Sequence, residues 1–241
     1  MKIDPPLFPA TLIKRYKRFL ADVRLDDGTE LTVHTPNTGS MLGCAEPGMR
    51  ILLRDTQNPK RKYLYSWEMS ETADGTKIGV NTGLSNQLVS EAIENGAIDT
   101  LRGYDSIQTE VKYGQENSRI DLLLSGKQGK CYIEIKNVTA ADKNGLAIFP
   151  DAVTQRGTKH LRELRAMVEQ GHRAVIFFSI QRQDITGFRP AWEIDPLYAK
   201  TLKEVLCQGV EVMAWQARVE PSEVVLVKSV PIYQGVPTHG A

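Results

Sequence analysis

The sequence predicts an α/β protein in two parts: a small β-barrel over residues 1–82, then a domain of αβββαβαβ order with a mixed sheet over residues 83–241. Two observations favour this class. Up to about Val80, short strand-like runs alternate with turn formers. After Gly83, apolar residues recur at helical spacing, which marks a change of architecture.

Six strand-like runs predict the barrel. They are ATLIKRY, RFLADVRL, ELTVHT, RILLRDT, RKYLYSWEM and KIGVN, separated by turns such as DDG, PNTG, EPG, QNP and ADG. Their order fits an OB-fold, whose strand face and loops can hold an oligonucleotide. A generic small barrel without a ligand is the alternative. In either case we expect PNTG to be only a turn, with Asn37 and Gly39 present for their backbone freedom.

The second domain is expected to begin with a helix that has Ser85 as its N-cap and ends at Gly96. Three strands, SIQTEVKYG, SRIDLLL and CYIEIKNVT, should follow as an antiparallel or mixed meander. The clearest helix is predicted in FPDAVTQRGTKHLRELRAMVEQG, with Asp151 as N-cap. Its expected apolar stripe consists of Val153, Leu161, Leu164 and Val168.

The rest of the chain completes the predicted order. RAVIFFSI reads as a buried strand, Pro196 to Cys207 as a helix and VEVMAWQARV as a last strand. The tail PIYQGVPTHGA is expected to be loose. The chain has no apolar run of membrane-spanning length and no secretory signal at its start, so we expect a cytoplasmic protein.

The composition limits the chemistry. Three cysteines lie far apart without a C-x-x-C pair, and four histidines are equally dispersed, which argues against a disulfide framework and a zinc site. Oxygen ligands holding Mg²⁺ or Mn²⁺ are the better expectation for any metal. The net charge of +1 does not by itself indicate a polyanionic partner.

Local charge does indicate nucleic acid. IKRYKRF places basic residues around aromatic rings, and NPKRKYLYSW places them before Tyr63, Tyr65 and Trp67. Cations that neutralise phosphates, interleaved with rings that stack on bases, are typical of nucleic-acid grooves. The candidate phosphate ligands are Arg15, Lys17, Arg18, Arg61 and Lys62. The alternative is that the rings point into the barrel and the cations into solvent.

An acid and a base interrupt one face of the strand CYIEIKNVT. Side chains two positions apart share a strand face, so Glu134 and Lys136 are neighbours. Asp121 lies in the preceding apolar strand, where a carboxylate is costly to bury without compensation. A divalent cation shared by Asp121 and Glu134 would supply it, and Lys136 could then position a water for attack on a phosphodiester.

This arrangement, an Asp followed by Glu-x-Lys on the next strand, resembles the PD-(D/E)xK nuclease superfamily, although Ile120 stands where its motif has Pro. Further segments extend over nearly the whole chain, in the order RYKRFLADV, HTPNTGSM, VNTG, EVKYG, SRIDLLL, YIEIKNVT, FPDAVTQRGTKHLREL and IDPLYAKTL. Together they resemble the bacterial sugar fermentation stimulation protein family. The resemblance implies a DNA-binding protein of low sequence specificity, linked to maltose metabolism, with a nuclease-like C-terminal part.

A third acid and several cations complete the candidate site. The superfamily resemblance favours Glu91, on the first helix of the second domain, as the third acidic residue, with Glu110 as the alternative. Arg119 shares a strand face with Asp121 and could hold a phosphate. Arg156, Lys159 and His160 form a possible phosphate-contacting ridge on the later helix, and the resemblance adds Gln155. A solvated helix face is the alternative for this ridge.

Three functions are compatible with these features. The first is nonspecific DNA binding with a regulatory effect on sugar metabolism. The second is an active Mg²⁺-dependent DNA or RNA nuclease that uses Asp121, Glu134 and Lys136. The third, transcription regulation at a defined operator, lacks a helix-turn-helix to support it. Single-stranded, duplex and branched DNA all remain candidate ligands, and the oligomeric state stays open.

Overall fold

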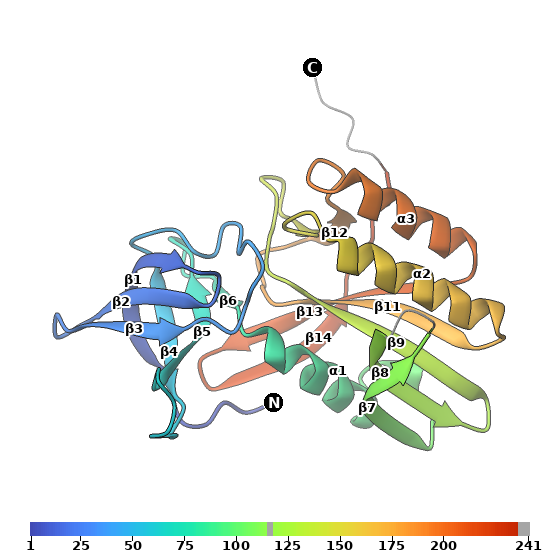
Figure 1. Cartoon of the computed structure of the whole chain (residues 1–241), viewed down its shortest axis with the longest axis horizontal. Helices are drawn as coiled ribbons and strands as arrows, with labels where there is room; N and C mark the ends of the chain where they lie inside the picture. The colour runs from blue at the N-terminus through green and yellow to red at the C-terminus, as the bar shows by residue number, and fades with distance from the viewer. Residues whose placement is uncertain (115–117, 236–241) are drawn as a thin grey trace.

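The structure is a computed structural model, and it describes residues 1–114 and 118–235 (Figure 1). It confirms the predicted class, an N-terminal β-barrel followed by an α/β domain. No helix within the described ranges has the length and hydropathy that a membrane crossing requires.

The barrel is a curled sheet with the strand order β3-β2-β1-β4-β5-β6, closed by pairing of His34 with Ser66 between β3 and β5. Its strands coincide with the six predicted runs: β1 (Phe8–Tyr16), β2 (Leu20–Leu25), β3 (Glu30–His34), β4 (Arg50–Asp55), β5 (Tyr65–Glu71) and β6 (Lys77–Gly79). Alternate side chains along these strands fill a buried core around Trp67, Leu53 and Val23.

The second domain is built on a six-stranded sheet of order β14-β13-β11-β9-β8-β7. Its strands are β7 (Ser106–Tyr113), β8 (Ser118–Gly126), β9 (Gly129–Val138), β11 (Arg173–Ile180), β13 (Glu211–Glu220) and β14 (Glu223–Ser229). The pairs β7–β8 and β8–β9 are antiparallel, as expected for the predicted meander. The strands β9, β11 and β13 run parallel to one another. The sheet is therefore mixed.

Helices cover both faces of this sheet (Figure 1). They are α1 (Ser85–Glu94), α2 (Gln155–Glu169) and α3 (Pro196–Cys207), with short 3-10 turns at Thr82–Leu84 and Asp99–Leu101. α1 packs on the face that carries Ile133 and Phe177, and α2 and α3 pack on the face that carries Phe178. A two-stranded parallel pair, β10 (Leu146–Phe149) with β12 (Gly187–Pro190), packs against the core that α2 and α3 form with the sheet.

Several expected boundaries were wrong. α2 begins after Thr154, whose hydroxyl oxygen accepts the Gly157 N–H, and Asp151 caps nothing there because its carboxylate binds another loop. Val153 precedes the helix and is 74% exposed, so it is no part of an apolar stripe. Ser85 is the first residue of α1, and its hydroxyl donates to Asn137 instead of capping the helix.

The strands β10, β12 and β14 were not predicted, and part of the tail is ordered. Main-chain hydrogen bonds join Phe188 to Pro231 and Tyr233, because β12 has an open edge that can accept another extended segment. Residues 236–241 of the predicted loose tail lie outside the described residues.

Two main-chain contacts connect the barrel to the second sheet. The Gly79 N–H donates to the Gln181 carbonyl at 2.9 Å, and Ile78 forms a bridge with Arg182. At the other end of the barrel, residues 1–3 pair with the start of β14, and the Met1 ammonium donates to the Val224 carbonyl. The barrel is thereby held at the end of the sheet from which β9 and β11 emerge.

Replacing Phe178 with alanine should lower the free energy of unfolding by about 3–5 kcal/mol. The ring is fully buried and stacks on Phe188 with 4.1 Å between centroids, so its loss leaves a cavity. Urea titration followed by tryptophan fluorescence measures the change. Phe19→Ala is the control, since that ring is 46% exposed and its removal should cost under about 1 kcal/mol. Equal losses in the two variants would contradict this description of the core.

Candidate functional site

The two strands that carry the acidic residues separate at the site. β8 and β9 pair as far as Leu122 and Ile133, and Asp121 lies immediately beyond that pair. Its Oδ2 accepts the main-chain N–H of Ile135 at 2.7 Å, so the carboxylate satisfies a donor that the ladder leaves unpaired. The strand separation thus places a carboxylate at the mouth of a gap in the sheet.

Glu134 and Lys136 lie on the same face of β9, as strand alternation predicted. The Lys136 ammonium donates to Glu134 Oε1 at 2.6 Å, and His160 of α2 contacts the same oxygen through Nδ1. The other oxygen, Oε2, is buried and has no hydrogen-bond partner within the described ranges. Glu134, which is only 2% exposed, therefore has one satisfied and one unsatisfied carboxylate oxygen.

The two carboxyl groups have opposite pKa shifts. Burial, followed by the negative charge of Glu134, raises the pKa of Asp121 to about 6, against the opposing effects of the Ile135 N–H and the Lys136 ammonium. Burial also disfavours ionisation of Glu134, but the charge of Lys136 and the contact with His160 outweigh it and lower its pKa. A cation shared by the pair would relieve the repulsion that Asp121 experiences.

Glu110 is directed toward this pair by a bend in β7. Its φ angle of 54° is left-handed, a conformation that costs a non-glycine residue roughly 1–3 kcal/mol. The Asn86 amide contacts both acids, with Nδ2 at 3.1 Å from Asp121 Oδ1 and 3.4 Å from Glu110 Oε1. The Arg119 guanidinium donates to the Glu110 carbonyl at 3.0 Å and steadies the bend.

Glu91 occupies a different position. Its carboxylate is 45% exposed and forms an ion pair with the Met1 ammonium at 3.0 Å. It lines a neighbouring depression on α1 but not the cleft that contains Asp121 and Lys136. Of the two candidate third acids, the structure brings Glu110 to the pair and leaves Glu91 apart.

Residues from both domains line the cleft around Asp121, which has a volume of about 490 Å³. Asn37, Thr38 and Gly39 of the barrel form one wall. The other walls are formed mainly by polar and charged residues of the second domain: Ser85, Asn86, Glu110, Asp121, Lys136, Asn137, Thr139 and Asp151, together with Phe149. The segment PNTG is therefore more than a turn, contrary to expectation.

A single guanidinium holds this wall in place. Arg15 donates to four main-chain carbonyls at 2.6–3.3 Å, those of Arg18, Asn37, Gly39 and Ser40. Burial lowers the pKa of Arg15, against the attraction of Asp151. Asp151 fixes the far end of the loop, because its Oδ2 accepts the Met41 N–H at 2.9 Å. Arg15 is thus occupied by the protein's own carbonyls, and its predicted phosphate contact does not fit this arrangement.

The other predicted phosphate ligands of the barrel lie on two exposed segments. Lys17 and Arg18 form the β1–β2 turn with left-handed φ angles of 49° and 63°. Arg61 and Lys62 are exposed in the loop before β5, and the Lys62 ammonium lies 5.5 Å from the centre of the Tyr63 ring. Both segments leave cations accessible to solvent.

The aromatic rings that follow Arg61 and Lys62 in the sequence lie mostly inside the barrel. Trp67 is fully buried, and its indole N–H donates to the Met69 carbonyl. Tyr65 packs edge-on against Phe8. For these two rings the alternative interpretation, inward-facing strand residues, was the right one.

The residues of the predicted phosphate-contacting ridge on α2 differ in their exposure to solvent. His160 is buried against Glu134 and cannot contact a nucleic acid directly, which corrects its expected role. Arg156 is exposed, and its Nε donates to His160 Nε2 at 3.3 Å. Lys159 is half-buried on the same helix. Gln155 is exposed at the first helical position and does not line the cleft.

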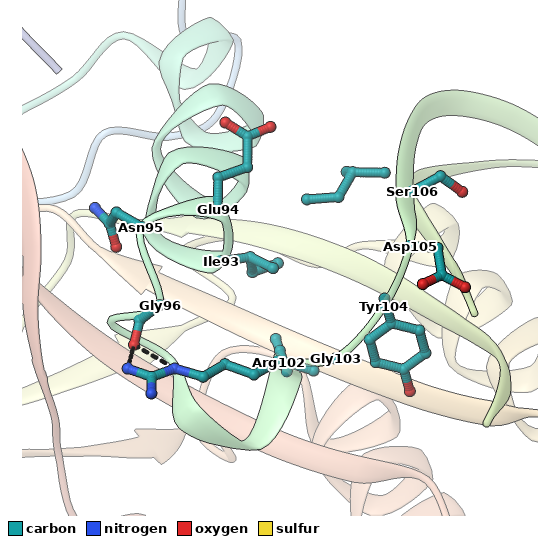
Figure 2. Close-up of a pocket in the computed structure, with 11 residues that line it drawn as sticks. Ile93, Glu94, Asn95, Gly96, Arg102, Gly103, Tyr104, Asp105 and Ser106 are labelled. Carbon is teal, nitrogen blue, oxygen red and sulfur yellow. Dashed lines mark hydrogen bonds between the residues drawn. The ribbon is translucent and has the colours of Figure 1, made fainter. Parts of the chain in front are cut away.

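A second cleft, of about 610 Å³, lies between the end of α1 and the segment that leads into β7. Figure 2 shows Glu94 and Asp105 on opposite walls and Arg102 turned toward the Gly96 carbonyl. The same guanidinium forms an ion pair with Asp99 at 2.8 Å. The Asp121 cleft is the stronger candidate for chemistry, because it has a buried carboxylate and an ammonium side by side, whereas Arg102 is exposed and paired with an exposed Asp99.

Comparison with known proteins agrees with this architecture. The family model described as "Sugar fermentation stimulation protein RE domain" matches residues 83–223, and the one described as "SfsA N-terminal OB domain" matches residues 13–80. The chain belongs to the sugar fermentation stimulation protein (SfsA) family. This confirms the resemblance that the sequence showed.

Relatives within the SfsA family span nearly the whole chain. A sugar fermentation stimulation protein homolog of Thioalkalivibrio sulfidiphilus is 54% identical over 94% of this chain and 95% of its own length. One from Citrifermentans bemidjiense is 56% identical over 96% and 99%. The solved structure of Pyrococcus furiosus SfsA in complex with Ca²⁺ has a TM-score of 0.88 at 27% identity, covering 97% of this chain and 98% of that one.

Two features of this site, the wall at Asn37–Gly39 and the contact of His160 with Glu134, were not predicted from the sequence. The wall at Asn37–Gly39 was visible only as a polar segment within the matching HTPNTGSM. The contact of His160 with Glu134 was visible only as a histidine on a polar helix face. The helix α2 also lies close to α3, since a Cβ atom at Gly157 would meet Tyr198 at 3.0 Å. Such proximity depends on packing that one sequence does not encode locally.

In chelator, Asp121→Asn should stabilise the protein increasingly as pH rises. The pKa of Asp121 is raised to about 6 in the fold, so the wild-type carboxyl favours folding while neutral, and this stability is lost as pH rises through that value. The amide remains neutral at every pH. The difference in unfolding free energy should grow from near zero at about pH 4 to roughly 2 kcal/mol at about pH 8, allowing for solvent screening. Urea titrations across this range measure it, and a difference independent of pH would contradict the argument.

Proposed function

We propose that this chain is a nucleic-acid-binding protein of low sequence specificity that hydrolyses phosphodiester bonds with a divalent cation. The observation that carries the proposal is the buried, unpartnered Oε2 of Glu134 beside Asp121 and Lys136. Buried polar atoms normally have a partner, and a carboxylate oxygen without one is suited to a cation. DNA is the proposed ligand, with RNA as a second possibility.

The donor set suits a hard cation such as Mg²⁺ or Mn²⁺. Asp121 and Glu134 would hold it, and Glu110 would contribute through its position beside Asn86. Mg²⁺ commonly binds through one or two carboxylates and keeps several waters, so a full protein cage is not needed. The Ca²⁺ complex of the Pyrococcus furiosus relative supports use of a divalent cation. When bound, such a cation lowers the pKa of a coordinated water and stabilises charge on phosphate.

The chain's own groups position the reactants. Lys136 is 13% exposed, close enough to solvent to bind a scissile phosphate oxygen or orient a water. His160 holds Glu134 Oε1 and leaves Oε2 free for the cation. Asn86 fixes the spacing of Asp121 and Glu110. Each role requires the strand separation that places Asp121 at the cleft.

Nonspecific binding is assigned to the exposed cations. Lys17 and Arg18 on one barrel segment and Arg61 and Lys62 on the other would neutralise phosphates, with Arg156 beside the site. Contacts to the phosphate backbone carry little sequence information and weaken as salt rises. Any effect on sugar metabolism would then act through this binding.

Binding without cleavage is the second candidate. Lys136 is already paired with Glu134, and no cluster of three or more His, Cys, Asp or Glu side chains in the described ranges is arranged to hold a metal ion. In that case the charged pair would serve as a phosphate-binding site, and the cleft would hold nucleic acid without cutting it.

Glu134→Gln should abolish cleavage while leaving nucleic-acid binding nearly unchanged. The amide removes the charge that attracts the cation, whereas the barrel cations remain, so the cleavage rate should fall by about a hundredfold or more. Supercoiled plasmid and labelled single-stranded and branched DNA, each with Mg²⁺, Mn²⁺ or chelator, provide the assay. A wild-type protein that binds these substrates and cuts none would establish the second candidate.

Glu110→Gln and Glu91→Gln form a matched pair that identifies the third acid. Calorimetric titration with Mn²⁺ should show about tenfold weaker binding for Glu110→Gln, because its carboxylate is held beside Asp121. Glu91→Gln should bind as the wild type does, since that carboxylate is paired with the Met1 ammonium. The reverse order of effects would restore Glu91 as the ligand.

A further inference from the structure

The Asn37–Gly39 wall and the candidate acids Glu110 and Asp121 line the same cleft. A volume of about 490 Å³ lies within the range of pockets that enclose one small molecule, roughly 300–1,000 Å³. By comparison, the major groove of a double helix alone is about 12 Å wide, so an intact duplex is much larger than this space. A duplex could not lie inside this space, whereas a single unpaired strand could.

The wall is tied down on every side. Arg15 holds the carbonyls of Asn37, Gly39 and Ser40, and Ser40 donates its hydroxyl to the Asp151 carbonyl at 2.7 Å. Within the wall, Asn37 Oδ1 accepts the Gly39 N–H at 2.8 Å. The Thr82 hydroxyl donates to the Pro36 carbonyl at 2.8 Å. Moving the loop would break several such bonds at once, each worth about 0.5–1.5 kcal/mol. The wall is thus a fixed part of the cleft.

We propose that the cleft admits a single unpaired polynucleotide strand and that the Asn37–Gly39 wall excludes double helices. The proposal deepens the proposed function, because it names the form of nucleic acid that the same site takes. A strand lying between barrel and sheet would bring one phosphate to Asp121 and Lys136 while its neighbours pass over the barrel.

The β1–β2 turn supplies contacts that suit an unpaired strand. Arg15 binds the Arg18 carbonyl and the wall carbonyls together, so this turn adjoins the wall. Lys17 and Arg18 are exposed there, and Phe19 beside them leaves 46% of its surface in solvent. A base can stack on an exposed ring only when it is unpaired, and such stacking is a recurrent feature of single-strand binding.

The test compares one sequence in three forms: single-stranded, blunt duplex, and duplex with a single-stranded arm, each as DNA and as RNA. Binding is measured by fluorescence anisotropy in Ca²⁺, and cleavage in Mg²⁺ or Mn²⁺. The single strand and the armed duplex should bind at least about tenfold more tightly than the blunt duplex, with any cuts in the arm. Comparison of the DNA and RNA versions of each substrate shows whether the site prefers deoxyribose or ribose.

Thr38→Trp tests the wall itself. Thr38 is exposed within the cleft wall, so the larger side chain should fill the space and weaken single-strand binding by about tenfold or more. Thr29→Trp is the control, because Thr29 is equally exposed but lies at the β2–β3 turn. Thr38→Ser should bind normally, and equal unfolding midpoints would show that the variants are folded. Phe19→Ala should weaken single-strand binding by about fivefold.

The outcomes separate the two proposals. The proposed preference for unpaired strands would be overturned, even if cleavage occurs, by equal binding of blunt duplex and single strand. Unchanged single-strand binding by the Thr38→Trp variant would overturn it as well. Absence of cleavage with every cation would overturn the hydrolytic function, yet a preference for unpaired strands that Thr38→Trp removes would still uphold the inference about the wall.

Discussion

The buried carboxylate of Glu134 constrains more of this molecule than any other group. Taking a charge out of water is costly unless oppositely charged or hydrogen-bonding groups surround it. Lys136 of the same strand and His160 of α2 both bind its Oε1, which ties the position of a helix to that of a strand. The unpartnered Oε2 belongs to the same arrangement.

A second cation organises the boundary between the two domains. Arg15 of β1 collects carbonyls from the β1–β2 turn and from the segment that reaches the second domain. Asp151 receives the end of that segment just before α2. Arg15, chosen from the sequence as a phosphate ligand, therefore holds the protein's own main chain, and the proposed nucleic-acid contacts belong to the exposed cations around it.

The sequence predicted what depends on local periodicity and missed what depends on distant contacts. Strand alternation placed Glu134 and Lys136 on one face, and helical spacing located Leu161 and Leu164 in the core. The choice between Glu91 and Glu110 depended on a left-handed bend in β7, which no residue type signals. The short pair β10–β12 required pairing across some forty residues, and β14 relied on an edge that only the folded sheet offers.

Because the barrel contributes one wall of the cleft, the two domains must be inherited together for the cleft to persist. A recombination event that joined this barrel to a different second domain would remove the Asn37–Gly39 side of the cleft. Selection on the shape of the cleft therefore acts on Arg15 and Asn37 as well as on residues of the sheet. The barrel cannot diverge independently of the second domain, because Asn37, Thr38 and Gly39 form one wall of the cleft.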